Sequence, residues 1–254
     1  CFNYLENKKK RNNLTLDEIE KISKNLDHLK YVTLAGGEPM IRNDVFDIIK
    51  IFHKNNGLQM LNIVTNGWFI EKIKNLANKV IKELPDLHIN FGISIDGLEE
   101  KHDFIRQKKG SFKKCCETLN ELKKISTENK NSKLTFNVNG VYTSENADSI
   151  IETSDFFIEK YQVPYTLCLV RGEDIQNNDY KKVDVDHYYK TYSQITDKND
   201  KIFSKNYPYK RVRLAVEDVM TEINYNSAKL NKATLKCKAG QKGFVINSSG
   251  EMLL

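Results

Sequence analysis

The chain has 254 residues, of which 39% are hydrophobic and 29% charged, which is enough for one large α/β domain or one domain with an appendage. Its formal net charge of +6 comes from 40 basic residues dispersed among 34 acidic ones, without the motifs of nucleic-acid-binding proteins. No apolar run approaches the ~18–20 residues that span a bilayer, and the chain opens on a basic stretch rather than a signal peptide. We therefore expect a soluble, cytoplasmic protein that binds neither nucleic acid nor a membrane.

From residue 15 onward, helical and strand-like patterns alternate. Apolar residues recur at helical spacing over Thr15–Leu29, where Thr15 and Glu18 form a capping box. The segments with strand patterns are Tyr31–Ala35, Leu61–Thr65, Leu87–Ile95, Lys133–Val141 and Pro164–Val170. The helical segments between them span residues 44–54, 69–84, 111–128 and 147–161. This βα repetition predicts a parallel sheet covered by helices, either open or curled into a barrel.

Each predicted strand ends in a glycine-containing or polar turn, and ligand sites lie at the carboxyl ends of strands in such folds. The sheet lacks an expected first strand, because a helix precedes any strand. Beyond Gly172 the rhythm changes to a polar loop over residues 173–184. Helices are predicted over residues 185–196 and 212–224, and a boundary is expected near residues 225–236.

The five cysteines are Cys1, Cys115, Cys116, Cys168 and Cys237. They are too few and too dispersed for a secreted disulfide scaffold, so we expect reduced thiols or metal ligands. Cys115 and Cys116 are adjacent on a predicted helix and cannot easily face one metal, so both are expected to be buried or idle. Cys168 is expected in the core of a strand.

The strongest local signal is Gly36-Gly37-Glu38-Pro39, directly after a predicted strand. Glycines let a ligand approach the backbone closely, Glu38 offers a carboxylate to a ligand ammonium, and Pro39 makes the exit rigid. The segment fits neither a dinucleotide-binding nor a phosphate-binding loop. From these residues alone, it is either an ordinary turn or a ligand site.

With Cys1 upstream, this segment resembles the SAM-binding motif of radical S-adenosylmethionine (SAM) enzymes. That family carries a Cys-x3-Cys-x2-Cys signature before its first helix, and Cys1, followed by Phe2 and Tyr4, is similar to the third cysteine in position and context. The resemblance implies that the first two cysteines and the first barrel strand lie upstream of this chain.

Two further motifs agree with the family in their order. Thr65-Asn66-Gly67 ends the next predicted strand, as is common there. Ser94-Ile95-Asp96-Gly97, followed by His102, Asp103 and Arg106, resembles the S-x-D-G…H-D…R pattern of the subgroup with SPASM domains. That subgroup includes sulfatase-maturing and peptide-modifying enzymes.

The resemblance spans residues 1–171 and implies a [4Fe–4S] cluster held by three thiolates, with one iron open to SAM. In the family, the reduced cluster cleaves SAM into methionine and a 5′-deoxyadenosyl radical, while the protein holds the cofactor. The SAM-binding residues that it implies are Gly36, Gly37, Glu38, Pro39, Asn66, Ser94, Asp96, Arg106, Asn137 and Val138.

Roles for these residues also follow from the resemblance. Gly36–Glu38 would meet the methionine amine, and Ser94 and Asp96 would lie near the ribose or the carboxylate. Asn137 and Val138, on a later strand, would lie against the adenosyl group.

Structural alternatives stay open for some of them. Ser94 and Asp96 are also typical of strand-end capping, and Asp96-Gly97 is an ordinary turn pair. Arg106 is either a partner for the SAM carboxylate or the surface partner of Asp103.

The C-terminal segment resembles the opening of a SPASM domain. Cys237 begins a glycine-rich stretch, and residues 244–251 have the pattern of a hairpin. Cys237 is followed by Gly250 and four more residues at the spacing of that domain, whose next residue would be a cysteine. The resemblance implies that Cys237 is a ligand of an auxiliary iron–sulfur cluster, and a structural thiol is the alternative.

The expected fold is α/β: a partial (β/α)6 radical SAM barrel without its first strand (residues 1–172), a helical connector (173–230) and the start of an auxiliary-cluster domain (231–254). The expected iron ligands are Cys1 and Cys237. The parent protein would use its [4Fe–4S] cluster and SAM to start hydrogen abstraction from a peptide or protein side chain, with flavodoxin or ferredoxin as electron donor. This chain alone is expected to be inactive, because one thiolate cannot hold the cluster.

Two other functions compete with this one. A degenerate, non-catalytic barrel that binds a partner stays open, and the residues upstream of Cys1 would distinguish it from the enzyme. An ordinary nucleotide-binding α/β domain is disfavoured, because the chain has no phosphate loop.

Overall fold

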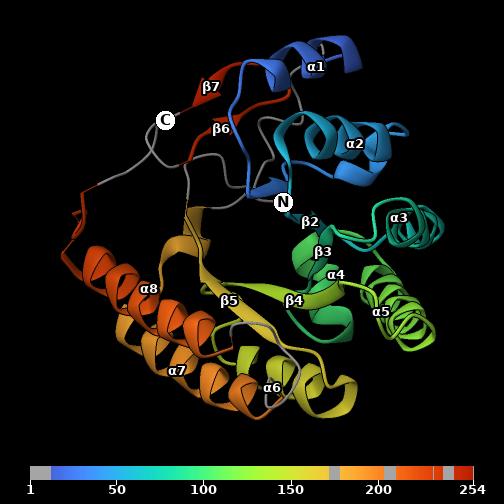
Figure 1. Ribbon diagram of the computed structural model, residues 1–254. Coiled ribbons are helices and arrows are strands. Elements are labelled where there is room, and N and C mark those ends of the chain that lie inside the picture. The colour runs from blue at the N-terminus through green and yellow to red at the C-terminus, as the bar shows by residue number, and fades with distance from the viewer. Residues whose placement is uncertain (1–12, 172–177, 203–209, 231, 237–242, 254) are drawn as a thin grey trace. The chain divides into compact units, whose positions relative to one another are not determined.

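The computed structural model describes residues 13–171, 178–202, 210–230, 232–236 and 243–253. The chain divides into two compact units. Of the described residues, the first unit contains residues 14–140, and the second contains residue 13 and the residues from 141 onward. Figure 1 labels the elements of both units. The predicted iron ligands Cys1 and Cys237 lie outside the described residues.

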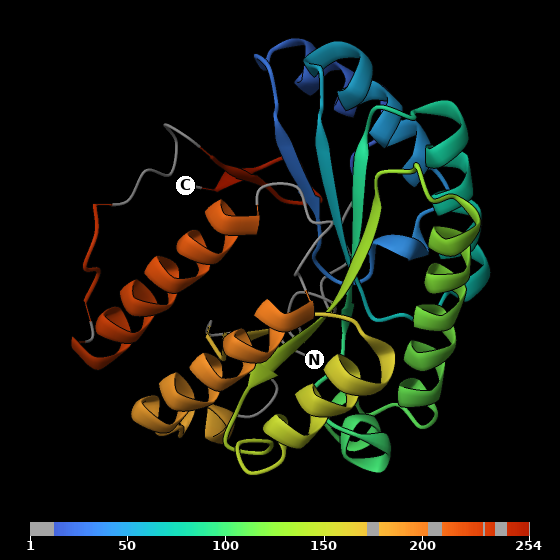
Figure 2. The ribbon, with the colours of Figure 1, turned by 60° about the horizontal axis from the view of Figure 1, so that its bottom comes forward.

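In the first unit, strands alternate with helices. Its strands are β1 (Tyr31–Leu34), β2 (Met60–Thr65), β3 (His88–Ser94) and β4 (Leu134–Tyr142), the last of which runs two residues into the second unit. Its helices are α1 (Leu16–Lys24), η2 (Pro39–Ile41), α2 (Val45–Asn56), α3 (Ile70–Glu83), α4 (Glu99–Arg106) and α5 (Ser111–Glu128). Neighbouring strands pair in parallel, and the helices line one face of the sheet (Figure 2).

The sheet confirms the predicted fold class. Its strand order is β1-β2-β3-β4-β5, in which β5 is Tyr165–Leu169. This order, with each strand next to its successor, is the one expected when every crossover has the same hand, and it fits a partial (β/α) barrel. All turns after β1, β2 and β3 therefore lie at one end of the sheet, where a ligand site is expected.

The two faces of the sheet differ in polarity. Successive residues of a strand point to opposite faces, and Ile63, Phe91, Ile93 and Val138 on the helix side have no exposed surface. On the other face, polar side chains are register partners across four strands: Thr33, Asn62, Asn90 and Thr135. Parallel sheets are usually apolar on both faces, so the polar face is unusual and marks the side open to polar ligands.

The predicted helices are present, with shifted ends. The capping box of α1 is confirmed, with the amide of Glu18 bonded to Thr15 Oγ1, but the helix ends at Lys24 because Asn25 Nδ2 binds the carbonyl of Lys21. Helix α2 ends at Gly57, whose φ of 63° closes the last turn. Helix α4 is not predicted by the sequence patterns.

The second unit contains α6 (Ile150–Asp155), a π-helical turn η3 (Phe156–Tyr161), β5, η4 (Asn178–Lys181), α7 (Val185–Ile202), α8 (Lys210–Leu230) and the strands β6 (Val245–Ile246) and β7 (Met252–Leu253). Helix α7 packs against both α8 and β5. Strands β6 and β7 form the predicted hairpin, with antiparallel pairing of Val245 and Leu253.

The expectation for Cys168 is wrong. On β5, Tyr165 and Leu167 are buried, whereas Cys168 alternates to the opposite face and is exposed. The strand pattern predicts the alternation but not which face is covered. In the described residues, no helix is long and apolar enough to span a bilayer.

Candidate functional site

The turn after β1 is held in place by the carboxylate of Glu38. Its Oε1 accepts hydrogen bonds from Thr65 Oγ1 (2.7 Å) and from the amide of Met40 (3.1 Å), and its Oε2 accepts one from the amide of Asn66 (2.7 Å). A carboxylate can accept about four such bonds, so one position is left for a ligand ammonium. Glu38 therefore ties the Gly-Gly turn to the end of β2.

The other side of this turn is held by Lys72, in the first turn of α3. Its Nζ donates to the carbonyls of Met40 (3.0 Å) and Ile41 (3.2 Å) and to Asn43 Oδ1 (2.7 Å). Pro39 starts the short helix η2 whose carbonyls Lys72 binds, and Gly36 has a φ of 119°, which favours glycine. The loop is thus fixed before any ligand arrives. Neither Thr65 nor Lys72 is among the site residues predicted from the sequence.

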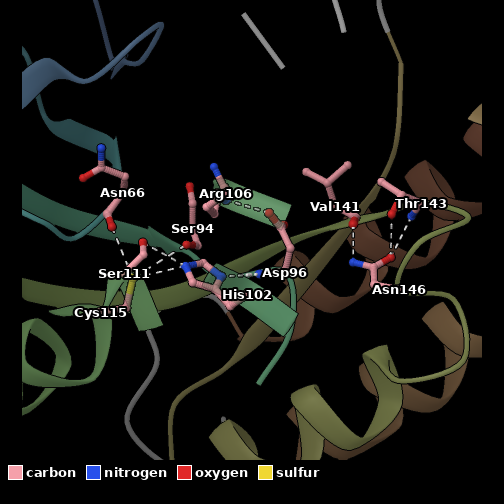
Figure 3. A network of polar contacts seen from close by, with 10 residues as sticks. All are labelled: Asn66, Ser94, Asp96, His102, Arg106, Ser111, Cys115, Val141, Thr143 and Asn146. Atoms are coloured by element: carbon pink, nitrogen blue, oxygen red, sulfur yellow. Dashed lines mark hydrogen bonds and ion pairs between the residues drawn. The ribbon is translucent and has the colours of Figure 1, made fainter. Parts of the chain in front are cut away.

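Two predicted ligand residues present polar atoms at neighbouring strand ends. Asn66 Oδ1 accepts from the amide of Trp68 (2.9 Å), which leaves Asn66 Nδ2 without a partner in the described part of the chain. Ser94 Oγ, on the next strand, also has no partner among the described residues. The side chains of Asn66 and Ser94 point in the same direction (Figure 3). We call Asn66 and Ser94 the donor row, because both can donate hydrogen bonds to one ligand.

An ion pair joins the end of β3 to the end of helix α4. Asp96 is fully buried, and its Oδ2 lies 2.7 Å from Arg106 Nε. The surface alternative for Arg106 is wrong, since Asp103 instead accepts hydrogen bonds from the amides of Gly110 (2.5 Å) and Phe112 (2.8 Å) at the start of α5. Asp96 therefore orients Arg106, and Asp103 caps a helix.

His102 joins this pair to helix α5. The amide of Asp96 donates to His102 Nδ1 (3.1 Å), so the ring proton of neutral His102 lies on Nε2 and faces Ser111 Oγ (3.2 Å) (Figure 3). Burial, together with the positive charge of Arg106, lowers the pKa of His102 to about 4. His102 is therefore neutral at physiological pH and acts as a fixed link between α4 and α5.

Cys115 closes the network from α5. Its Sγ lies 3.2 Å from the carbonyl of Asn66, and burial raises the pKa of this thiol to about 12. Gly67, beside it, has a φ of 72°, and a Cβ there would lie 3.2 Å from Cys115 Sγ and 3.1 Å from a methyl group of Ile93. The expectation of a buried, idle thiol agrees with this arrangement, and the thiol supports the chain beneath Asn66.

Asn137 and Val138 lie on opposite faces of β4. Val138 points to the helices and has no exposed surface, so only its backbone can meet a ligand on the polar face. Asn137 lies on the polar face and is 6% exposed. Its Nδ2 donates to Asn139 Oδ1 (2.7 Å) and to the carbonyl of Val138 (3.3 Å), and its Oδ1 accepts from Asn90 (2.8 Å).

A second polar cluster belongs to the second unit. Asn146 Oδ1 accepts hydrogen bonds from the amide and hydroxyl of Thr143, and Asn146 Nδ2 donates to the carbonyl of Val141 (Figure 3). Asn146 is buried and all its polar atoms are bonded within one turn. This cluster shapes the turn after β4.

No group of three His, Cys, Asp or Glu residues in the described part of the chain could hold a metal ion. A hollow of about 380 Å³ lies at the amino ends of β3 and β4, where Leu87 and Lys133 line it. That end of the sheet is opposite to the donor row.

Comparison with known proteins gives a family match over most of this region. The model of the radical SAM superfamily matches residues 1–157 of the 254. GTP 3′,8-cyclases of Clostridium perfringens strains SM101 and 13 are each 33% identical to the chain over 90 residues. That stretch is 34% of this chain and 26% of those enzymes.

Solved structures with a similar fold cover more of the chain. Native anSMEcpe with bound AdoMet superposes with a TM-score of 0.56 at 19% identity, and its complex with AdoMet and the Cp18Cys peptide with 0.54 at 19%. In each case, the match covers 93% of this chain and 63% of the other. The chain thus spans under two thirds of the relatives that it matches.

Proposed function

Because the chain belongs to the radical SAM superfamily, we propose that it is part of an enzyme that cleaves SAM reductively and starts hydrogen abstraction from a peptide or protein side chain. The family match implies SAM and a [4Fe–4S] cluster as cofactors. The observation that carries the proposal is the donor row at the strand ends, directly beside the turn that Glu38 and Lys72 hold.

The residues present fit SAM. Its methionine ammonium needs an acceptor, and the Glu38 carboxylate has one position left beside the backbone of Gly36 and Gly37. Its carboxylate and ribose oxygens are acceptors, which suit Asn66 Nδ2 and Ser94 Oγ.

Pro39, Asp96 and Arg106 have supporting roles in this proposal. Pro39 opens the short helix that fixes the turn. Arg106 contributes a positive charge toward the SAM carboxylate, and the buried Asp96 sets its orientation rather than touching the ligand.

We assign the cluster to thiolates that include Cys1, and an auxiliary cluster to Cys237. Bound together, the cluster and SAM supply the one-electron cleavage of a carbon–sulfur bond that the family uses to begin radical chemistry. In this proposal, this chain's residues hold the cofactor at the polar face of the sheet, while the apolar face packs against the helices. A flavodoxin or ferredoxin would supply the electron.

A peptide or protein side chain is the proposed substrate, in a cytoplasmic setting. The support is the anSMEcpe complex, which contains a peptide as well as AdoMet and shares the fold. The SPASM-type organisation proposed for residues 231–254, after a connector over 173–230, rests on Cys237 and on the β6–β7 hairpin that follows it.

The test is anaerobic reconstitution of the full-length protein with iron and sulfide, followed by reduction in the presence of SAM. We expect 5′-deoxyadenosine and methionine in equal amounts, together with about four irons per barrel cluster. A double variant, Asn66→Ala with Ser94→Ala, should bind iron normally but weaken SAM binding at least tenfold by calorimetry. A protein that binds SAM without cleaving it would instead be the non-catalytic binding module.

A further inference from the structure

Tyr142, the last residue of β4, lies against the first turn of helix α7. Its side chain has no exposed surface, and its Oη lies 2.5 Å from His187 Nδ1. Among the described residues, this hydroxyl group has no other hydrogen-bond partner. A buried hydroxyl proton needs an acceptor, so Tyr142 donates to Nδ1, and the ring proton of neutral His187 lies on Nε2.

The phenol of Tyr142 keeps its proton at neutral pH. Burial, followed by the negative charges of Asp184 and Asp148, raises its pKa above the ordinary value. Asp184 is held at the start of α7, because its Oδ1 accepts hydrogen bonds from the amides of Asp186 (2.9 Å) and His187 (3.1 Å). Ionisation to a phenolate is therefore disfavoured. Loss of an electron is different, because an oxidised phenol is a strong acid and gives its proton to a base already in hydrogen-bond contact.

Two further tyrosines of α7 form a path from Tyr142 toward the surface. The ring centroids of Tyr142 and Tyr188 are 5.3 Å apart, and those of Tyr188 and Tyr192 are 6.0 Å apart. Tyr188 is buried, and its hydroxyl bonds to the backbone of Leu169, which takes up no proton. Tyr192 is half-buried. Rings this close exchange electrons readily, and of the three tyrosines it is Tyr142 whose hydroxyl is bonded to a base.

Tyr225, on α8, shows what a less oxidisable tyrosine looks like in the same unit. Its hydroxyl donates to Asp186 Oδ1 (2.5 Å) but also accepts from Lys229 Nζ (2.7 Å). A cation that donates to the phenol oxygen holds the electrons of the ring more tightly and so opposes oxidation. Tyr225 therefore provides an internal control for Tyr142.

We propose that Tyr142 and His187 form a redox-active pair, which reduces strong one-electron oxidants of the peroxyl-radical class. In this step the oxidant gains one electron, by way of Tyr192 and Tyr188. The O–H bond of Tyr142 breaks, and its proton forms an N–H bond with His187 Nδ1. Tyr142 becomes a neutral phenoxyl radical and His187 an imidazolium ion. When a thiol or another reductant returns the electron, His187 returns the proton.

The oxidant class rests on the proposed function, whereas the redox pair itself does not. An enzyme that forms carbon-centred radicals meets peroxyl radicals whenever O2 adds to such a radical. A peroxyl radical that gains the electron of Tyr142 and a proton from water becomes a hydroperoxide. The oxidising equivalent then lies on a buried ring, where it can be reduced again.

The test oxidises full-length protein, without SAM, with photogenerated tris(bipyridine)ruthenium(III) and detects radicals by freeze-quench EPR spectroscopy. Protein with ring-deuterated tyrosine identifies a tyrosyl signal, because that signal narrows on deuteration. Tyr142→Phe keeps the ring and removes the hydroxyl. His187→Gln keeps a hydrogen-bond acceptor for Tyr142 but removes the base. Tyr225→Phe is the matched control, and thermal unfolding confirms that each variant is folded.

We expect a tyrosyl radical of equal intensity in wild type and in Tyr225→Phe. In Tyr142→Phe and His187→Gln the signal should fall about tenfold or more, because losing a positioned proton acceptor slows proton transfer by about 10²-fold or more.

A second measurement exposes the same proteins to peroxyl radicals from a water-soluble azo initiator in air, and mass spectrometry maps the oxidised residues. Tyr142 should be oxidised in wild type although its side chain is buried. Its oxidation should decrease in His187→Gln and in Tyr188→Phe, which interrupts the path from Tyr192.

A wild-type protein without a tyrosyl radical, or a full signal in Tyr142→Phe, would overturn the inference. Equal signals in wild type and His187→Gln would show that the imidazole takes up no proton and would overturn the pair. A tyrosyl radical with ruthenium(III), but no oxidation of Tyr142 by peroxyl radicals, would overturn the oxidant class. None of these measurements uses SAM, so failure of the proposed function is seen separately, as a protein that forms the radical but does not cleave SAM.

Discussion

The two faces of strands β2, β3 and β4 are built from alternate residues of the same segments, yet they serve different ends. Toward the helices, the apolar side chains of Phe91, Ile93 and Val138 are fully buried. One residue away, Asn90 and Asn137 form hydrogen bonds along the opposite face. Residues that stabilise the fold thus alternate along each strand with residues on the face proposed to bind the ligand. Single substitutions should therefore affect stability and ligand binding separately.

The largest expected effect comes from a substitution that disrupts the packing of the apolar face alone. Phe91→Ala should lower the free energy of unfolding by about 3–5 kcal/mol, because it leaves a cavity among fully buried side chains. Urea unfolding followed by circular dichroism measures the loss. Val64→Ala, on the polar face of the adjacent strand, is the control and should cost about 1 kcal/mol or less, since Val64 is only half-buried. Similar losses in the two variants would contradict the contrast between the faces.

A pH-dependent effect should come from His102, beneath the donor row. Its pKa is about 4 in the folded protein and about 6.5 when unfolded, so the unfolded state binds more protons between these values. Stability is therefore complete above pH 6.5 and falls as the pH drops toward 4, by about 3 kcal/mol in all. Urea unfolding at several pH values should show this loss in wild type and a shallower one in His102→Gln. His28→Gln, at an exposed position, should leave the profile as in wild type.

The smallest expected effect comes from Gly67, where an added methyl group would contact Ile93 on the apolar face. Gly67→Ala combines a positive φ with contacts of 3.1–3.2 Å to Ile93 and Cys115, and should cost about 2 kcal/mol. Gly110→Ala shares the positive φ but has open space around the new methyl group, so it should cost only about 1 kcal/mol. Chemical unfolding of both variants separates strain from crowding. Because Gly67 follows Asn66, SAM affinity should fall in the first variant only.

Much of the sheet could be predicted because its signals are local. The strands of the first unit alternate in polarity and end in glycine-containing or polar turns, so their bounds differ from those expected by at most one residue. Helix α4 was missed because it has eight mostly charged residues, of which only His102 and Ile105 are buried. A pattern of two inward residues is too short to give a helical period.

Most site contacts could not be predicted, since they join residues far apart in the sequence. Thr65 and Lys72 reach the turn after β1 from about thirty residues away, and nothing in the residues themselves indicates those partners. Arg106 has an acidic neighbour three positions before it but pairs with Asp96, ten positions before it. The roles of Cys1 and Cys237, and the domain limits drawn around them, stay predictions.

Because Cys115 is buried, the rate at which its thiol is alkylated can report how often the ligand site opens. A thiol whose pKa lies near 12 reacts with alkylating reagents only after it reaches water, and Cys115 reaches water only when α5 separates from Gly67. Its alkylation rate, followed by mass spectrometry, therefore reports the free energy of that local opening. Any ligand that binds across Asn66 and Ser94 should slow the labelling, so occupancy of the strand ends can be timed without a catalytic assay.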